Sequence, residues 1–260
     1  MNPMKLVLRS FCVLLAITLF STQVWSQTTA IEILTQVSEK QQAHNSIQHV
    51  QMTLTARNGT QQIRQMEVRV LTTQDSRFSY VRFSQPADVA GTQLVIIDHN
   101  DQEDEQLLYL PALKRIQLIR QHARTGPFMG SDFRFEDMNG PDVDHADHTI
   151  FSQDDLSWVI DSRPHPQSTS SYGLVRTHIR KTTYHPTTIE YFDDENNPIK
   201  VLTIEDSIVS NGITLPIVST MTNLSRGTST RLEVIEHRIN VPQSEIPPET
   251  FTRSYMRRNG

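Results

Sequence analysis

The spacing of apolar residues changes from a helical period to a strand period near residue 45. Between residues 28 and 44, Ile31, Leu34 and Val37 recur three residues apart, and most positions between them carry charged or amide side chains. Apolar residues at this spacing lie on one face of an α-helix. The pattern therefore predicts one amphipathic helix at the start of the folded chain.

A period of two dominates the rest of the sequence. Apolar and polar residues alternate over residues 52–57 and again over 66–70, and the Asn58-Gly59 pair between them is typical of a tight turn. These two runs predict a hairpin of long strands. Ten further segments have the composition of strands: residues 77–84, 92–98, 106–110, 115–119, 156–162, 174–183, 188–192, 199–206, 213–222 and 230–239.

The order of these segments indicates the fold class. Strands do not alternate with helices, so a doubly wound parallel sheet is excluded, and the polar connections between strands are short. We predict a mainly antiparallel β protein with a single large curved sheet. This open barrel has about eleven or twelve strands, with one N-terminal helix.

One segment breaks the strand period. Residues 123–149 contain Gly126, Pro127, Gly130, Gly140 and Pro141, which interrupt regular structure. We predict an insertion of loop and short helix. It is either a cap that completes the core of the sheet or a lid over a cavity for a hydrophobic ligand, and both can hold at once. Five large apolar side chains would serve either role: Phe128, Met129, Phe133, Phe135 and Met138.

The first 26 residues have the pattern of a secretory signal peptide. Lys5 and Arg9 precede ten apolar residues, 11–20, and the chain then reaches Val24-Trp25-Ser26, where a signal peptidase would cut. Ten residues are too few to cross a bilayer, which needs about 20. We predict a cleavable signal peptide over residues 1–26 and a single domain over residues 27–260.

Cleavage changes both the charge and the cysteine content. It removes two cations and no acidic residue, so the formal net charge falls from −5 to −7, which disfavours nucleic acid as a partner. The single cysteine, Cys12, leaves with the signal peptide, and its position inside the apolar run is wrong for lipidation. We therefore expect an unlipidated, monomeric protein without disulfides in an oxidising compartment, most simply the periplasm. In a eukaryotic secreted protein, Asn58 and Asn223 would instead accept glycans.

The sequence contains no recognisable catalytic signature. A nucleophile elbow, a phosphate-binding Gly-rich loop and a metalloprotease helix motif are all absent. The stretch from Asp142 to His148 is rich in oxygen and nitrogen ligands, but its spacing matches no calcium or zinc site. We predict no enzyme activity, no metal and no cofactor.

Four motifs give the chain a family resemblance. They are FSQPADVAGT at residues 83–92, LLYLPALKRI at 107–116, FMGSDFRFEDM at 128–138 and IPPETFT at 246–252. Their order and content resemble the outer-membrane lipoprotein-sorting proteins, in the LolA-like branch. The resemblance spans nearly all of the sequence after residue 26.

The resemblance implies an open half-barrel whose concave face, covered by helices, forms an apolar cavity for acyl chains. The implied function is a periplasmic carrier of a lipid or lipoprotein toward the outer membrane. An inner-membrane transporter, such as an RND-type exporter, is the implied protein partner. In this hypothesis Phe128, Met129, Phe133, Phe135 and Met138 form the lid or cavity lining. The sheet floor is formed by Val95, Ile97, Leu108 and Leu110.

Two points distinguish this chain from the carriers of general lipoprotein traffic. Its insertion is longer, and no residue in the sequence is matched to the basic side chain that holds the lid in those carriers. The alternative function is a sensor that binds lipoprotein or lipid in the same half-barrel and signals to a membrane partner.

Overall fold

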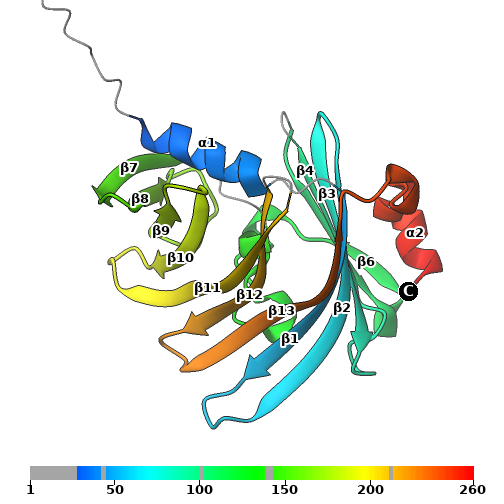
Figure 1. Cartoon of the computed structure of the whole chain (residues 1–260). Helices are drawn as coiled ribbons and strands as arrows, with labels where there is room; N and C mark the ends of the chain where they lie inside the picture. Colours follow the sequence, from blue (N-terminus) through cyan, green and yellow to red (C-terminus); the bar gives the residue numbers. More distant parts are fainter. Residues whose placement is uncertain (1–27, 42–44, 100–101, 139–142, 211–212) are drawn as a thin grey trace, which may run out of the picture.

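The protein folds into one antiparallel sheet of thirteen strands, shown in Figure 1. The computed structural model describes residues 28–41, 45–99, 102–138, 143–210 and 213–260. The predicted signal peptide, residues 1–26, lies outside the described residues. The strands are β1 (Ser46–Thr55), β2 (Gln61–Thr72), β3 (Ser76–Gln85), β4 (Gln93–His99), β5 (Glu105–Leu110), β6 (Arg115–Leu118), β7 (Ala146–Gln153), β8 (Ser157–Pro164), β9 (Leu174–Arg180), β10 (His185–Phe192), β11 (Pro198–Ser210), β12 (Ile213–Asn223) and β13 (Thr228–Ile239).

The predicted fold class is confirmed, with one strand more than predicted. The missed strand is β7, whose first half, residues 146–149, falls within the predicted insertion. It is an edge strand, and half or more of its side chains are exposed, so its sequence, ADHTIFSQ, lacks the apolar alternation of a half-buried strand. Pairing with β8, from Ala146 opposite Pro164 to Gln153 opposite Trp158, holds it in the sheet.

The strand order places the first and last strands of the chain side by side at the middle of the sheet. The order is β6-β5-β4-β3-β2-β1-β13-β12-β11-β10-β9-β8-β7, so β1 pairs with β13. The strands β6 and β7 are consecutive in sequence but lie at opposite edges of the sheet. The segment between them must therefore cross the open side of the curved sheet. This segment begins with η2 (Gln121–Ala123), η3 (Phe128–Gly130) and η4 (Phe135–Met138), and we call residues 119–138 the insert.

The N-terminal helix, α1 (Ala30–Gln41), packs against β7, β10 and β12. It begins with a capping box, in which the Thr29 amide donates to the Glu32 carboxylate at 2.8 Å and the Glu32 amide donates to Thr29 Oγ1 at 3.2 Å. Its buried side is rotated slightly from the predicted one. Ile31 is 54% exposed, and the residues that face the sheet are Ala30, Ile33, Leu34 and Val37.

Side chains on the inner face of the sheet form the concave cluster. Its buried members are Val50, Met52, Met66, Phe83, Val89, Leu94, Ile96, Leu108, Ile119, Phe128, Phe133, Phe135, Tyr172, Tyr191 and Met221. The insert supplies four of them and lies within the curve of the sheet (Figure 1). The half-barrel implied by the family resemblance is therefore present, and its concave face is occupied by this segment.

A second set, the convex cluster, lies on the outer face of the sheet, where η6 (Pro248–Phe251) and α2 (Arg253–Arg258) cover it. Its buried members are Leu71, Tyr80, Val95, Leu107, Tyr109, Val241, Ile246, Phe251 and Met256. Gln93 fixes α2 there, because its amide donates to the Met256 carbonyl at 2.9 Å and accepts from the Tyr80 hydroxyl at 2.9 Å.

Two residues predicted to lie on the floor of the concave face belong instead to the convex cluster. Val95 is fully buried and Ile97 half-buried in this cluster, so neither lies on the floor of the concave face. Their neighbours Leu94 and Ile96 point inward instead. All four residues are apolar because both faces of β4 are covered, which hides the alternation that normally distinguishes the faces.

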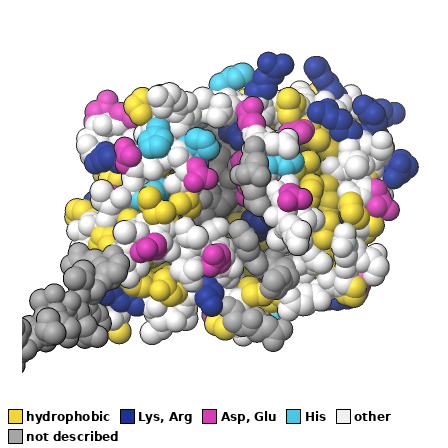
Figure 2. Space-filling model, turned by 90° about the horizontal axis from the view of Figure 1, so that it is seen from above, with side chains coloured by type: hydrophobic (Ala, Val, Ile, Leu, Met, Phe, Trp, Pro, Cys, Tyr) yellow, Lys and Arg dark blue, Asp and Glu magenta, His cyan; other side chains and the backbone are white. Residues whose placement is uncertain are grey.

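The surface near α2 is locally basic although the net charge of the chain is negative. Figure 2 shows Lys and Arg side chains gathered at the end of the molecule where α2 lies, and Arg253, Arg257 and Arg258 of this helix are exposed. Within the described residues, no helix is both long enough and apolar enough to cross a membrane.

Candidate functional site between the insert and the concave face

Aromatic side chains hold the insert on the sheet. Phe128 is 2% exposed, and its ring centroid lies 5.9 Å from that of Phe83 on β3 and 5.5 Å from that of Phe135. The Phe128 and Phe135 rings meet edge to face, at 78°, which is a favourable aromatic geometry. Phe133 is buried in the same cluster. The insert therefore fills the inner face of the half-barrel with apolar surface.

A tight bend brings these rings together. Met129 and Gly130 have positive φ angles of 50° and 73°, and the Ser131 hydroxyl donates to the Phe128 carbonyl at 2.7 Å. A bridge between Pro127 and Arg134 closes the loop, so Phe128 and Phe133 leave the same short turn. Met129 and Met138 are half-buried against the concave cluster.

Polar side chains of the sheet bind the backbone of the insert at three places. Arg64 of β2 donates from Nη1 to the Met129 carbonyl at 2.5 Å. Gln106 of β5 donates to the Phe135 carbonyl at 3.1 Å, and Thr230 of β13 accepts from the Asp132 amide at 3.0 Å. In the order of the sheet these three strands extend from β5 to β13, so the contacts attach the insert to one half of the sheet.

Arg64 is one of the site residues that the sequence analysis did not predict. It occupies an inward position of β2, opposite Met52, and it is only 9% exposed. The sequence did contain a signal for it. Arg64 lies two residues before Met66, at a position where the strand alternation of the predicted hairpin calls for an apolar residue. Arg64 is the basic residue of the described sheet that holds the insert at Met129.

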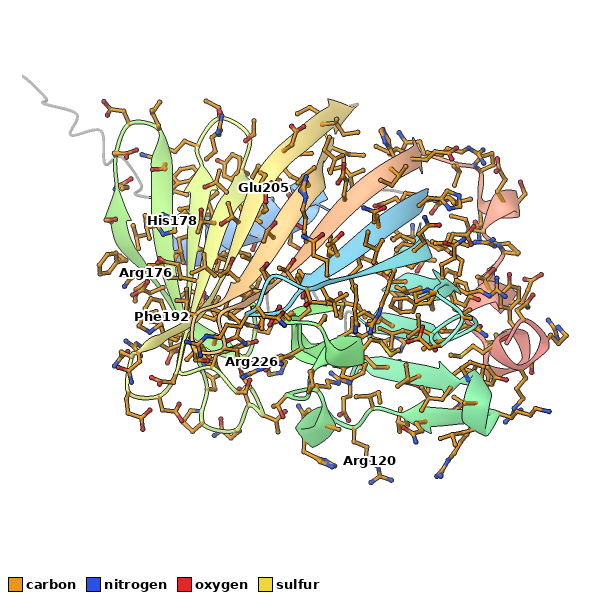
Figure 3. The ribbon with its side chains drawn as sticks, turned by 90° about the horizontal axis from the view of Figure 1, so that it is seen from below. Arg120, Arg176, His178, Phe192, Glu205 and Arg226 are labelled. Atoms are coloured by element: carbon orange, nitrogen blue, oxygen red, sulfur yellow. The ribbon has the colours of Figure 1, made fainter. Side chains whose placement is uncertain are left out.

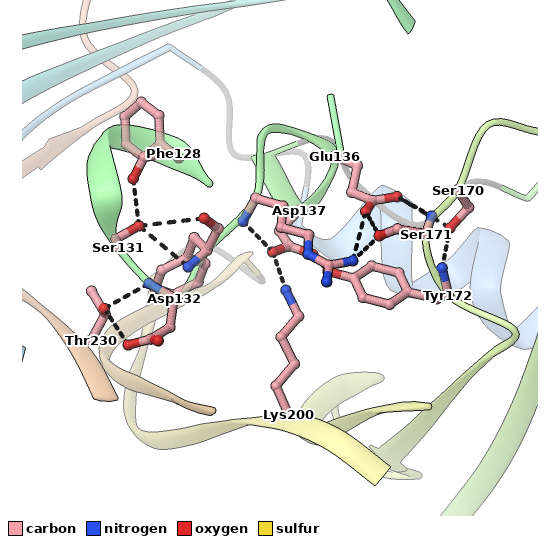
Figure 4. A network of polar contacts seen from close by, with 12 residues as sticks. Phe128, Ser131, Asp132, Glu136, Asp137, Ser170, Ser171, Tyr172, Lys200 and Thr230 are labelled. Carbon is pink, nitrogen blue, oxygen red and sulfur yellow. Dashed lines mark hydrogen bonds and ion pairs between the residues drawn. The ribbon is translucent and has the colours of Figure 1, made fainter. Parts of the chain in front are cut away.

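A buried ion pair joins the other end of the insert to β11, as Figure 4 shows. Lys200 Nζ lies 2.5 Å from Asp137 Oδ2, and the two side chains are 3% and 2% exposed. The same carboxylate accepts from the Tyr172 hydroxyl at 2.8 Å and from the Arg134 amide at 2.6 Å. Asp137 is therefore bound by donors from the sheet and by one donor from the insert itself.

Two tyrosine rings enclose the Lys200 ammonium. Its Nζ lies 4.8 Å from the ring centroid of Tyr172 and 4.6 Å from that of Tyr191, distances at which a cation is attracted to the face of a ring. Burial lowers the pKa of Lys200, and the Asp137 carboxylate opposes that shift. Burial also raises the pKa of both tyrosines above the ordinary value, with a further contribution from Asp137. Both hydroxyls therefore stay protonated at neutral pH.

A second ion pair borders this centre. Arg134 lies over the Tyr172 ring at 4.9 Å from its centroid and pairs with Glu136 at 3.5 Å. The Glu136 carboxylate also accepts from the Ser171 amide, 3.2 Å away, and from the Ser171 hydroxyl. The connection between β8 and β9 is thereby tied to the insert.

The predicted site residues divide into two groups. Phe128, Met129, Phe133, Phe135 and Met138 come together on the concave face, where they pack with Leu108 and Leu110 of β5. Val95 and Ile97 lie on the convex face. The structure brings the lid residues and half of the predicted floor together, and Lys200, Tyr172 and Tyr191 join them without having been predicted.

Two pockets lie beside the insert. One of about 190 Å³ lies between Asp132 and the ends of β1 and β13, and its lining includes Arg226 and several threonines. Another, of about 480 Å³, lies beside η2 and is lined mainly by charged residues, including Arg120, which points away from the sheet in Figure 3.

Within the described ranges, no group of three or more His, Cys, Asp and Glu could hold a metal ion. Of the ligand-rich stretch noted in the sequence, Asp142 lies outside the described residues. His148 uses both ring nitrogens in contacts, with Ser162 Oγ at 2.8 Å and the Val143 carbonyl at 3.1 Å.

Comparison with known proteins places this architecture in a family. A family model described as "Uncharacterized protein" matches residues 75–258, and no curated protein matches the sequence. An outer membrane lipoprotein-sorting protein domain from Vibrio parahaemolyticus is 25% identical, with a TM-score of 0.80 over 88% of this chain and 98% of that chain.

Two further solved structures share the fold. A DUF1329 family protein from Desulfovibrio piger is 20% identical with a TM-score of 0.80, and the match covers 87% of this chain and 97% of that chain. A LolA superfamily protein from Nitrosomonas europaea is 16% identical with a TM-score of 0.66, covering 88% and 100%. The chain therefore belongs to the family whose model matches residues 75–258, and the structural matches show that it shares the half-barrel fold of outer-membrane lipoprotein-sorting and LolA superfamily proteins.

Proposed function

We propose that this protein is a periplasmic carrier that holds the acyl chains of a lipid or lipoprotein between the concave face and the insert, for transfer toward the outer membrane. The observation that supports this function most directly is that a segment joining the two sheet edges packs three phenylalanines onto the inner face. The same segment is held by separate polar contacts at Met129, Asp132 and Asp137. A segment bound in this way can be displaced without unfolding the sheet.

The energies of the exchange support reversible transfer. Taking a sixteen-carbon chain out of water is favourable by about 0.8 kcal/mol per CH₂, or roughly 12 kcal/mol in total. Exposing the three buried phenylalanines of the insert would cost about 1.5–3 kcal/mol each, and loss of the polar contacts would add to this. The free energy gained by burying an acyl chain and the free energy lost by displacing the insert are therefore of similar size. A carrier with this balance can both load and release cargo without covalent chemistry.

A disulfide that fixes the insert to the sheet tests this proposal. Asp132 and Thr230 have side chains in contact, with Thr230 Oγ1 donating to Asp132 Oδ2 at 2.9 Å. The secreted chain lacks cysteine once Cys12 is removed, so an Asp132→Cys, Thr230→Cys variant contains the only pair that can form. Uptake of a phospholipid and of a diacylated lipopeptide would be measured by native mass spectrometry, in the oxidised and reduced states.

We expect the oxidised variant to take up at least tenfold less of both molecules than the reduced variant. The Thr230→Cys single variant, which cannot form the internal bridge, should bind equally in both states. If the oxidised variant, shown by its mass to be cross-linked, binds as well as the reduced one, the insert is not a lid and the proposal fails.

The cellular context remains part of the proposal. The signal-peptide pattern and the lipoprotein-sorting relatives support a periplasmic location. An inner-membrane transporter of the RND type is the partner implied by the family resemblance, and a sensor of lipoprotein or lipid is the alternative function. A sensor would bind a membrane-protein ectodomain with an affinity that changes on lipid loading, whereas a carrier would transfer its lipid to acceptor membranes.

A further inference from the structure

The buried ion pair on the concave face suggests what kind of head group the cargo carries. We propose that Lys200, with Tyr172 and Tyr191, forms a binding site for the anionic head group of an amphiphilic cargo, which the Asp137 carboxylate occupies while the insert lies on the sheet. This inference rests on the proposed carrier function and specifies the chemical class of the ligand.

The donors of this site belong to the sheet side of the contact. Lys200 lies on β11 opposite Tyr191 of β10, and Tyr172 lies two residues before the start of β9. Two of the three donors to Asp137, the Lys200 ammonium and the Tyr172 hydroxyl, would therefore stay in place if the insert moved away. They would then face the concave surface with no carboxylate between them.

Close backbone packing fixes the position of Tyr172. The next residue, Gly173, donates its amide to the Phe192 carbonyl at 3.0 Å, which continues the pairing of β9 with β10. A Cβ atom at Gly173 would lie 2.5 Å from the Asp193 carbonyl oxygen, so only glycine fits. The tyrosine hydroxyl is thus held where it can donate to an anion beside Lys200, and its ring packs against that of Tyr191 at an angle of 48°, with centroids 4.8 Å apart.

The insert itself has the chemistry of an anionic amphiphile. Its apolar part, Phe128, Phe133 and Phe135, covers the inner face of the sheet, and the Asp137 carboxylate follows two residues after the last ring. An amphiphile that placed acyl chains where the rings lie would bring a head group to the place where the carboxylate lies. A carboxylate or a phosphate would replace Asp137, whereas a neutral head group would leave Lys200 buried without a counter-charge.

Stability alone is a weak explanation for this pair. Burying a lysine and an aspartate removes two charges from water, and well-packed apolar residues of similar volume usually stabilise a fold at least as well. The two aromatic faces stabilise the cation whether or not Asp137 is beside it, and the Tyr172 hydroxyl can donate to an exchangeable anion as readily as to a fixed carboxylate. Because Asp137 lies on the insert, displacement of the insert would free Lys200 to bind another anion in its place.

The test compares amphiphiles that share one chain and differ in head group. Binding of dodecanoate, dodecyl phosphate and nonionic dodecyl maltoside, each below its micelle concentration, would be measured by calorimetry on the secreted protein. We expect both anionic amphiphiles to bind at least tenfold more tightly than the maltoside, and the stronger of the two identifies carboxylate or phosphate as the preferred group.

Four variants assign the preference to this site. Lys200→Met should weaken anionic binding at least tenfold and leave maltoside binding within twofold, whereas Lys114→Met, which removes an exposed cation, should change neither. Asp137→Asn removes the competing carboxylate and should strengthen anionic binding several-fold. Tyr172→Phe keeps the ring, loses the donor, and should weaken anionic binding less than Lys200→Met does.

The outcomes separate this inference from the carrier function. Equal binding of all three amphiphiles by the wild type, or a preference that survives Lys200→Met, overturns the head-group site and leaves the carrier function intact. If Lys200→Met does not fold, unchanged anionic affinity in both Asp137→Asn and Tyr172→Phe overturns it equally. Failure of every amphiphile to bind any variant would overturn both proposals.

Discussion

Removal of the Phe128 ring provides the most direct measure of how firmly the insert is bound. Phe128 is 2% exposed and contacts the rings of Phe83 and Phe135. In a rigid core, Phe→Ala costs about 3–5 kcal/mol, because transfer free energy is lost and a cavity remains. The insert can detach instead of leaving a cavity, so the loss cannot exceed the free energy with which the insert docks. We therefore expect Phe128→Ala to lower the free energy of unfolding by about 3 kcal/mol.

Two measurements on the same variant test this value. Urea unfolding should give the loss in free energy, and thermal unfolding should show a midpoint about 6–12 °C lower, at 2–4 °C per kcal/mol for a domain of this size. A detached insert exposes the concave face, so the apolar fluorescent probe N-phenylnaphthylamine should bind more strongly to Phe128→Ala than to the wild type.

Phe151→Ala is the matched control for Phe128→Ala. Phe151→Ala removes the same ring from β7, where Phe151 is 58% exposed and lies 3.6 Å from the Arg176 guanidinium, so it should cost only about 0.5–1 kcal/mol. A Phe128→Ala variant as stable as Phe151→Ala would refute the packing of the insert. A destabilised variant without increased probe binding would show that the insert is fixed core and not a lid.

Three further predictions concern the contacts around the sheet. Arg64→Met removes the donor to the Met129 carbonyl and should cost about 1.5–3 kcal/mol while increasing probe binding, as measured by urea unfolding and probe titration. Phe251→Ala, on the convex face, should cost about 3–5 kcal/mol in urea unfolding and leave probe binding unchanged. Burial, with a contribution from Arg180, lowers the pKa of His185 below its ordinary value of 6.5, so the folded state binds this proton less tightly than the unfolded state. The associated stability is present above about pH 6.5 and is lost as the pH falls through the folded pKa. His185→Gln should therefore lose less stability than the wild type between pH 7 and pH 5.

Each of these predictions has its own contradictory result. For Arg64, the control is Arg69→Met, which removes a cation from the outer face of the same strand, and equal probe binding by the two variants would contradict the role of Arg64. Increased probe binding by Phe251→Ala would mean that the two faces of the sheet are coupled. Parallel pH profiles for His185→Gln and the wild type would exclude His185 as the titrating group.

The sequence was sufficient for the elements that depend on local period. The amphipathic helix, twelve of the thirteen strands and the aromatic insert were each identified from the spacing of apolar residues and from turn residues such as Asn58-Gly59. Burial of Phe128, Phe133 and Phe135 was expected because large apolar side chains in an irregular segment need a surface to cover. These features are encoded within about ten residues and need no tertiary information.

In contrast, only the tertiary structure decided which face of the sheet each side chain points to and which residues pair with each other. Val95 and Ile97 were assigned to the wrong face because a strand covered on both sides has no alternation to read. Lys200 appeared to be an ordinary polar residue of a strand, and its partner Asp137 lies 63 residues earlier in the chain. The sheet order places β6 and β7 at opposite edges, which takes the insert across the concave face and brings its carboxylate to Lys200. Hydrophobic period is a local property of a chain, whereas the neighbours of a buried charge depend on how distant strands pair.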